Sequence, residues 1–191
     1  MTRKRIFSTF LLCFLFSSVG PAQVRQIDAA SSTVKVHVSK SGVLSAFGHD
    51  HEIDAPIVSG TLDVGAKRVE LHVNAAAMKV VDPGASEKDR AEIQSTMLGP
   101  EVLDANQYRE IVFRSTAATQ QSEGIWRVNG DLTLHGQSRP IMLDVTDQGG
   151  HYAGRVRIRQ TDFAIKPVKV AGGTVRVKDE VQIEFDIHVS P

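Results

Sequence analysis

The sequence predicts an all-β fold, an antiparallel β-barrel of about eight strands with a short helical insertion between strands 3 and 4. Two runs, 126–134 and 141–146, alternate apolar and polar residues on either side of a turn at 135–138, as expected for a β-hairpin with one apolar face. The last run, 181–189, alternates in the same way. Short turns that contain glycine separate such runs along most of the chain. Together these features favour one sheet closed around an apolar interior, and a β-sandwich is the alternative architecture.

The predicted strands follow one another along the chain, with apolar residues at alternate positions. They cover residues 34–38, 58–64, 69–73, 111–113, 126–134, 141–145, 156–158 and 181–189. Clean alternation indicates antiparallel pairing with one face in water, whereas strands of a parallel sheet are apolar on both faces.

One segment departs from the strand pattern and predicts a short helix. Ser86 to Asp89 resembles a capping box, with Asp in place of the usual Glu or Gln. Ile93 and Met97 lie one helical turn apart, and Gly99-Pro100 ends the helix. We expect this insertion to plug or cover one end of the barrel.

The interior admits two interpretations. A barrel of about eight strands is either filled by its own side chains or holds one slender ligand. The inward positions are mostly Val, Ile and Leu, and such a lining suits a hydrocarbon chain, which needs contact area and no hydrogen bonds. The alternation alone leaves both interpretations open.

The first 22 residues predict export. Arg3-Lys4-Arg5 precede an apolar stretch of 14 residues, 6–19, and Gly20-Pro21-Ala22 follow it, which is the pattern of a cleaved secretory signal peptide. The apolar stretch is shorter than the ~20 residues that span a bilayer. We therefore expect a periplasmic or secreted domain, residues 23–191, without an integral membrane span.

Charge and cysteine content exclude several classes of function. The chain has 22 Lys+Arg and 22 Asp+Glu, and loss of Arg3, Lys4 and Arg5 would leave 19 against 22. A slightly acidic domain without a basic stripe is a poor nucleic-acid binder. Cys13, the single cysteine, lies in the predicted signal peptide, so the exported domain has no disulfide and no thiol nucleophile.

Several stretches of the chain resemble the YceI-like family of lipid- or polyisoprenoid-binding domains. Gly130 to Pro140 is similar to the family's Gly-Asp-Leu-Thr segment, and Gln160 to Ile165 is similar to its Arg-x-Asp-Phe-Gly-Ile segment. Further similarity lies in the Val-x-Val-x-His opening, in 88–104 and in 108–116. The chain departs from the family at Val102-Leu103-Asp104, at Tyr108-Arg109, at Ala164 where glycine is usual, and at Gly48-His49-Asp50-His51.

The resemblance implies an extended, lipocalin-like barrel and a non-enzymatic binding protein for an isoprenoid or similar amphiphilic lipid, with a quinone as another candidate. A structural or interaction domain without lipid cargo is the alternative, and a homodimer is left open. We expect the apolar interior to contact the ligand through Val36, Leu71, Val73, Met97, Phe113, Trp126, Val128, Leu132, Leu143, Val156, Phe163 and Phe185.

Histidines raise a separate hypothesis of metal binding. His49 and His51 would project to one side of an extended segment, and a third ligand would complete a zinc or copper site. A polar loop with hydrogen-bonded histidines is the alternative. His37, His72 and His188 fall on the polar phase of their strands, where we expect them to be solvated.

Catalysis is not predicted. Ser45, His49 and Asp50 are the residue types of a hydrolytic triad, but three residues so close in sequence rarely adopt its geometry. A nucleophile-elbow motif is absent from the sequence.

Export can be tested at the amino terminus. Because small residues at Gly20 and Ala22 follow the apolar stretch, the exported protein is expected to begin at Gln23 or within a few residues of it. Amino-terminal sequencing of the exported protein checks this. A mature protein that retains Cys13 would contradict it.

Overall fold

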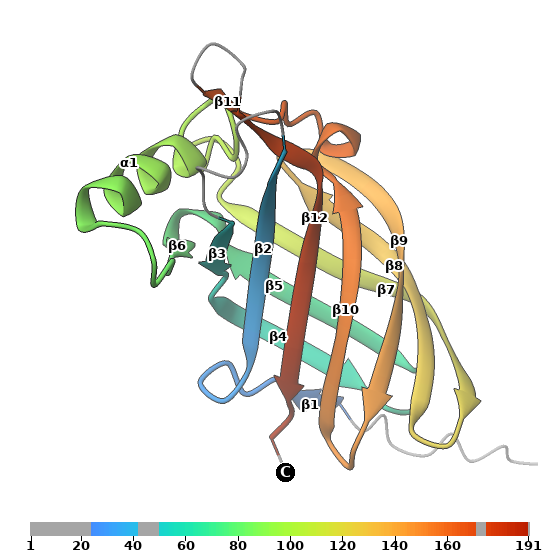
Figure 1. The fold of residues 1–191 in the computed structure, drawn as a ribbon. Coiled ribbons are helices and arrows are strands. Elements are labelled where there is room, and N and C mark those ends of the chain that lie inside the picture. The colour runs from blue at the N-terminus through green and yellow to red at the C-terminus, as the bar shows by residue number, and fades with distance from the viewer. Residues whose placement is uncertain (1–23, 42–49, 171–174, 191) are drawn as a thin grey trace, which may run out of the picture.

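The computed structural model describes residues 24–41, 50–170 and 175–190. The predicted signal peptide and His49 therefore lie outside the described residues. In the described part of the chain, antiparallel strands form one strongly curled sheet, and a helix lies at its upper end (Figure 1). This confirms the predicted all-β barrel-like fold.

The described residues contain twelve strands, more than the eight expected, because β1, β3, β6 and β11 are too short to show a clear alternation. The strands are β1 (Val24–Gln26), β2 (Thr33–Ser41), β3 (His51–Asp54), β4 (Ile57–Asp63), β5 (Arg68–Asn74), β6 (Lys79–Val80), β7 (Glu110–Ser122), β8 (Ile125–Leu134), β9 (Gln137–Asp147), β10 (His151–Arg159), β11 (Lys169–Val170) and β12 (Val175–His188). The helices are η2 (Ala75–Ala77), α1 (Glu87–Leu98) and η3 (Gln160–Phe163).

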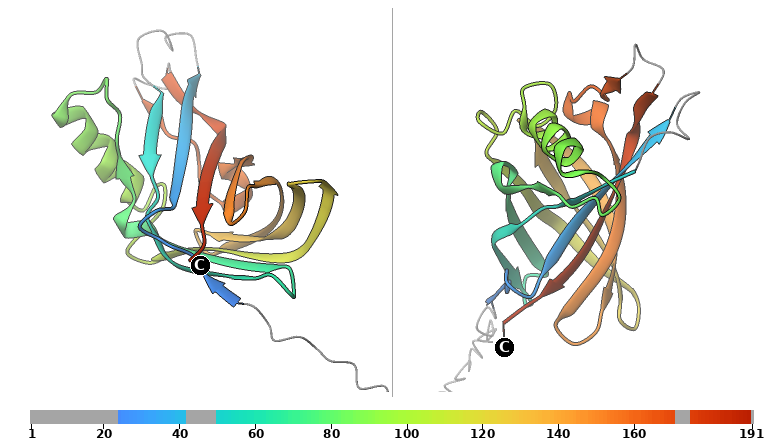
Figure 2. Two further views of the ribbon diagram at one scale, coloured as in Figure 1. Left: turned by 90° about the horizontal axis from the view of Figure 1, so that it is seen from below. Right: turned by 60° about the vertical axis from the view of Figure 1, so that its left-hand side comes forward.

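The sheet order is β1-β4-β5-β7-β8-β9-β10-β12-β2-β3-β6, and β11 pairs with β12. Two local features connect strands that lie far apart in this order. The chain passes from β3 to β4 through only Ala55 and Pro56, which makes a corner. At the lower end, Ile27 donates its N–H to the carbonyl of Gly60 (2.9 Å) and forms a β-bridge with Val189. The curl is visible from two further directions in Figure 2.

The helical insertion begins and ends where the sequence predicts. The hydroxyl of Ser86 accepts the N–H of Asp89 (3.1 Å), and Gly99 is the carboxyl-terminal cap. Gln94 ties the helix to the sheet, because its side chain accepts the N–H of Val80 (2.8 Å) and donates to the carbonyl of Met78 (2.7 Å). Met97, in the last turn of α1, has a buried side chain. The insertion is therefore fixed to the upper end of the barrel.

The predicted hairpin forms with the predicted phase. Register pairs Leu132 of β8 with Phe113 of β7 and with Arg139 of β9, and the turn between β8 and β9 holds His135 and Gly136 at positive φ. His135 has a structural role here: its Nδ1 lies 3.2 Å from the carbonyl of Phe163, and its ring contacts Tyr108 edge-on. Leu132 is buried, while the hydroxyl of Thr133 contacts that of Ser138 on the outer face.

A pair of neighbouring substitutions tests the phase of β8. Leu132→Asp places a carboxylate among apolar side chains, and we expect it to lower the free energy of unfolding by about 3 kcal/mol or more. Thr133→Asp changes the outer face, and we expect a loss of about 1 kcal/mol or less. Chemical denaturation of both variants checks this. Equal losses in the two variants would show that the assigned phase is wrong.

Candidate functional site

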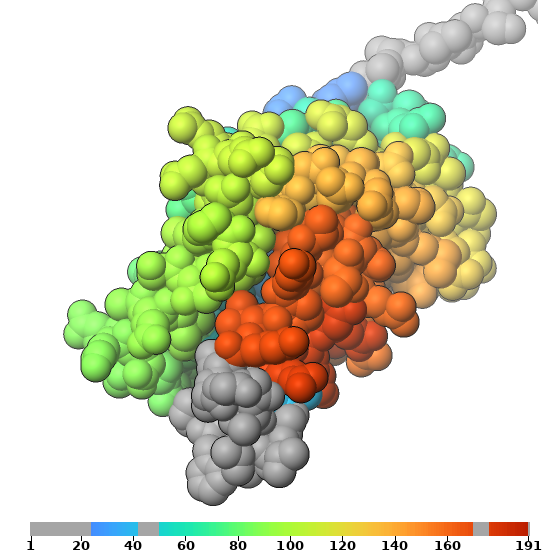
Figure 3. Space-filling view, turned by 90° about the horizontal axis from the view of Figure 1, so that it is seen from above, coloured from blue at the N-terminus to red at the C-terminus, as the bar shows by residue number. Residues whose placement is uncertain are grey.

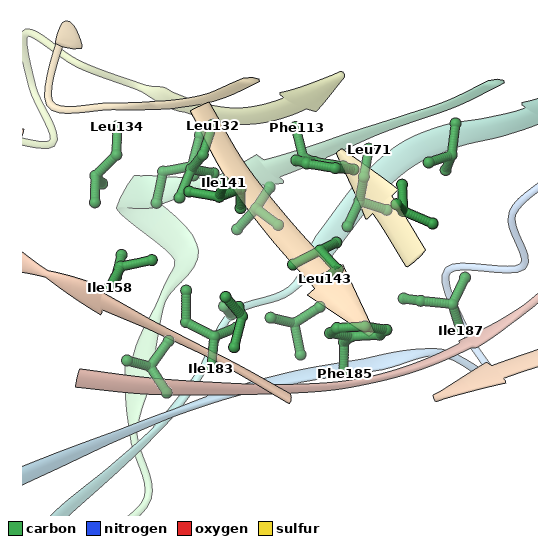
Figure 4. A pocket seen from close by; sticks show the side chains of 18 of the residues that line it. Leu71, Phe113, Leu132, Leu134, Ile141, Leu143, Ile158, Ile183, Phe185 and Ile187 are labelled. Carbon is green, nitrogen blue, oxygen red and sulfur yellow. The ribbon is translucent and has the colours of Figure 1, made fainter. Parts of the chain in front are cut away.

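The curled sheet encloses an apolar cavity of about 340 Å³. Side chains from most of the strands reach it, and Figure 4 shows leucine, isoleucine and phenylalanine side chains that face one another across it. The described lining consists almost entirely of aliphatic and aromatic groups. The interior therefore contains an apolar cavity, and the alternative of a fully filled core does not describe it.

Eleven of the twelve predicted interior residues line this cavity. They are Val36, Leu71, Val73, Met97, Phe113, Trp126, Val128, Leu132, Leu143, Val156 and Phe185. Ten of them lie on strands, where the apolar phase turns inward, and Met97 comes from α1. Their contact with a ligand remains a prediction.

Phe163 is the exception, since it does not line the cavity. It lies in η3, where the two-residue period of a strand no longer applies, and its side chain is packed into the core at 1% exposure. Ala164 follows in the left-handed conformation (φ 61°), which disfavours residues with a Cβ by about 1 kcal/mol or more. This conformation explains why glycine suits that position in the family's motif.

Two inward-facing glycines allow aromatic rings to lie against the wall. A Cβ at Gly130 would come within 2.5 Å of the Phe113 ring, and a Cβ at Gly154 would come within 2.5 Å of the Phe185 ring. Each phenylalanine thus covers a glycine on the neighbouring strand instead of extending across the cavity. The same close approach keeps space in the middle of the cavity.

The lower end of the cavity is polar and meets solvent. Val64, Lys67 and Arg68, in and beside the turn between β4 and β5, line the cavity and are exposed. Lys67 Nζ lies 5.5 Å from the centre of the Trp126 ring, and Arg68 donates to the carbonyl of Ser115 (3.0 Å). Two cationic side chains, those of Lys67 and Arg68, therefore lie between the apolar cavity and the solvent at this turn.

Asp147 and Tyr152 add two further polar groups to the lining, from the paired ends of β9 and β10. Burial raises the pKa of the Tyr152 hydroxyl, and the charge of Asp147 adds to this effect. The phenol is thus a neutral hydrogen-bond donor and acceptor at neutral pH. The sequence did not indicate these polar residues because they lie in or next to turns, where alternation does not show which side of the sheet a side chain faces.

The upper end of the cavity is lined by the helical insertion. Met97, Val102 and Leu103 contribute apolar side chains there, and Ile165 contributes another from the segment after η3. The space-filling view from above shows that the insertion and the segment 160–168 lie next to each other over this end (Figure 3). The expectation that the insertion covers one end of the barrel agrees with this placement.

The predicted metal ligands are described only in part. His51 opens β3, and its Nδ1 lies 2.6 Å from a carboxylate oxygen of Asp82, which is 3% exposed. That contact leaves Nε2 as the nitrogen that would bind a metal. His49 lies outside the described residues, so the His49–His51 site remains a prediction.

Two of the other histidines, His37 and His72, each lie beside a carboxylate on the outer wall. Nε2 of His37 on β2 lies 3.5 Å from a carboxylate oxygen of Glu184, and Nε2 of His72 on β5 lies 2.7 Å from a carboxylate oxygen of Glu70, so both rings are partly exposed and lie beside a carboxylate. Hydrogen bonds from His72 and Arg114 lower the pKa of Glu70. Ser45 lies outside the described residues, as does His49. In the part of the chain that the structure describes, no helix is long and apolar enough to cross a membrane.

Comparisons with known proteins find relatives that match most of the chain. The chain is 29% identical over 192 residues to a UPF0312 protein of Vibrio vulnificus, with 95% of this chain and 97% of the relative covered. It is 26% identical over 179 residues to a UPF0312 protein of Vibrio cholerae, with 88% and 89% covered.

Solved structures of similar fold include BcnA of Burkholderia cenocepacia, with a TM-score of 0.63, 20% identity, and 86% of this chain and 99% of that chain covered. The YceI protein of Campylobacter jejuni has a TM-score of 0.53 at 13% identity, with 81% and 85% covered. The model of the YceI-like domain matches residues 26–189, which include nearly all the described strands. The barrel, its helical insertion and this match together show that the chain belongs to the YceI-like family.

Proposed function

We propose that this protein is an exported, non-enzymatic binding protein that holds an isoprenoid or similar amphiphilic lipid inside its barrel. The observation that carries the proposal is the cavity of about 340 Å³ with its almost wholly apolar lining. This volume lies within the ~300–1,000 Å³ range of small-molecule sites. Burial of a hydrocarbon chain against such walls is favourable, and the chain requires no polar partner.

The polar lower end gives the ligand an orientation. Lys67 and Arg68 line the cavity and reach solvent, and Tyr152 supplies a hydroxyl nearby in the lining. We place the polar head of the amphiphile at this turn and its tail toward Met97 and Leu103 at the upper end. A head that carries negative charge would be favoured there, because the two cationic side chains beside the opening outnumber the one carboxylate in the lining, that of Asp147.

Supporting observations for the cargo class and the location come from the sequence. Isoprenoid binding is the expectation that the family resemblance implies, and residues 1–22 have the pattern of a signal peptide. Periplasmic or secreted location and non-enzymatic function follow from the same proposal, with residues 23–191 as one lipid-binding domain.

A substitution that fills the cavity tests the proposal. Ala118 of β7 lines the cavity, so Ala118→Phe inserts a ring into the space for the tail. We expect binding of a radiolabelled long-chain polyprenol to weaken at least tenfold, which corresponds to about 1.4 kcal/mol. Equilibrium binding at several protein concentrations measures this.

The matched control is Ala117→Phe, because Ala117 is the neighbouring residue and is exposed. This variant adds the same ring to the outer wall and is expected to bind polyprenol like the wild type. Thermal melts of both variants confirm that they are folded. Wild-type affinity in Ala118→Phe, or no polyprenol binding by the wild type, would contradict the proposal. A straight-chain fatty alcohol as a second ligand shows whether the branched chain is preferred.

A further inference from the structure

Two histidines and an aspartate gather on the outer wall near the lower end of the barrel. His151 begins β10, and Asp186 and His188 lie two residues apart near the end of β12. The antiparallel register places His151 directly opposite His188. All three side chains point away from the cavity, since Phe185 and Ile187, the alternate residues of β12, line it.

The three side chains converge on one point. Nε2 of His151 lies 2.5 Å from Oδ1 of Asp186, and Nε2 of His188 lies 3.1 Å from the same oxygen. One nitrogen from each ring and one carboxylate oxygen all lie within 4.8 Å of one another. The two imidazole rings are stacked, with their centres 4.4 Å apart and their planes at 16°. Three ligand atoms of the types that bind zinc therefore face one another.

The backbone holds this arrangement in place. His188 donates its N–H to the hydroxyl of Ser32 (2.9 Å), and Val189 donates to the carbonyl of Gly150, next to His151 (3.1 Å). β10 and β12 are paired along the whole of β10. The side chains themselves are 35–44% exposed, so solvent and ions have access to them. The cluster is thus preorganised at its backbone and open at its surface.

The surrounding charges are compatible with a cation. Asp28 lies close by, since its N–H donates to the carbonyl of His188 (2.9 Å). The hydroxyl of Ser31 and neighbouring backbone amides lower the pKa of the Asp28 carboxyl, so this group adds negative charge. One positive group, the guanidinium of Arg25, lies near Gly150, the residue before His151. Among the described residues, the basic side chains within 4.0 Å of the Asp186 carboxylate are those of His151 and His188.

We propose that His151, Asp186 and His188 form a binding site for Zn²⁺. In the neutral tautomer that carries its proton on Nδ1, each imidazole presents the lone pair of Nε2, and the two nitrogens and the carboxylate oxygen of Asp186 would bind the ion together. Zinc ligands at about 2.0–2.2 Å in a tetrahedron lie about 3.4 Å apart, so the pairs at 2.5 and 3.1 Å need to move by less than about 1 Å.

Water completes the fourth position of this site, which makes the bound ion exchangeable. Two imidazoles and one carboxylate suit zinc better than Ca²⁺ or Mg²⁺, which prefer oxygen ligands alone. The ion would link β10 to β12 at the end where Ile27 closes the barrel. The site lies on the outer wall, so it is independent of the lipid proposed for the interior.

Other histidines of the outer wall do not offer this geometry. His72 has two carboxylate neighbours, but Glu70 faces its Nε2 and Glu110 faces its Nδ1, on different sides of the ring. His37 faces the single carboxylate of Glu184. These residues are therefore matched controls for removal of surface imidazoles.

Calorimetric titration with Zn²⁺ tests the site. The full chain, without a polyhistidine tag, is expected to bind zinc with a saturable heat, and His151→Ala/His188→Ala is expected to weaken this binding at least tenfold. Asp186→Asn, which keeps the shape of the side chain, is expected to weaken it as well. His37→Ala/His72→Ala is expected to bind like the wild type. Lower pH should weaken binding, because protons compete for the imidazole nitrogens.

Two outcomes would overturn the inference. One is the absence of zinc binding by the folded wild type at millimolar Zn²⁺. The other is wild-type affinity in His151→Ala/His188→Ala. In that second case, His49→Ala/His51→Ala shows whether the heat comes from the pair predicted from the sequence. Thermal melts without zinc establish that each variant is folded, and polyprenol binding in the zinc-site variants is expected to be unchanged.

Discussion

The structure depends on the backbone ladder that holds the barrel wall around an apolar cavity. Apolar side chains on facing strands attract one another and would collapse into any space left between them. At about 24 cal/mol per Å³, a dry void of 340 Å³ would cost roughly 8 kcal/mol, which is comparable with the whole stability of many domains. The hydrogen bonds between strands, and the corner at Ala55 and Pro56, oppose this collapse. A bound hydrocarbon would remove the cost of the void.

The two faces of the wall perform separate tasks because side chains alternate along every strand. On β12, Phe185 and Ile187 face the cavity, while Asp186 and His188 face solvent. An apolar ligand inside and a metal ion outside can therefore be held by consecutive residues without competing for space. The same alternation makes the interior tolerant of outer-wall substitutions.

Alternation also determined how much the sequence could predict. Strand phase placed Phe113, Leu132 and Phe185 in the interior, and the Ser86 cap and Gly99 placed the ends of α1. Phe163 lies in the apolar core but does not line the cavity, because a 3-10 turn replaces the strand there. Lys67 and Arg68 were not singled out, since a turn has no period from which to read direction. The strands β1, β3 and β6 were missed because they are too short to show a recognisable alternation.

The register between strands that are distant in the sequence could not be predicted either. His188 was expected to be solvated, and it is partly exposed, but the pairing of β10 with β12 brings His151 onto its ring. Residues 37 positions apart meet there, and alternation within each strand cannot reveal which residues of another strand lie opposite. The buried partner of His51 was hidden for the same reason, because Asp82 follows β6, a two-residue strand that pairs with β3.

The central claim, that the barrel interior holds an amphiphilic lipid, is tested most directly by native mass spectrometry of protein purified from its own host without added lipid. The expected spectrum contains a population heavier than the polypeptide by the mass of one isoprenoid or related lipid, which is released on unfolding and identifiable by extraction. A folded protein that carries the mass of the polypeptide alone, and that takes up no lipid from a host extract, would contradict the claim.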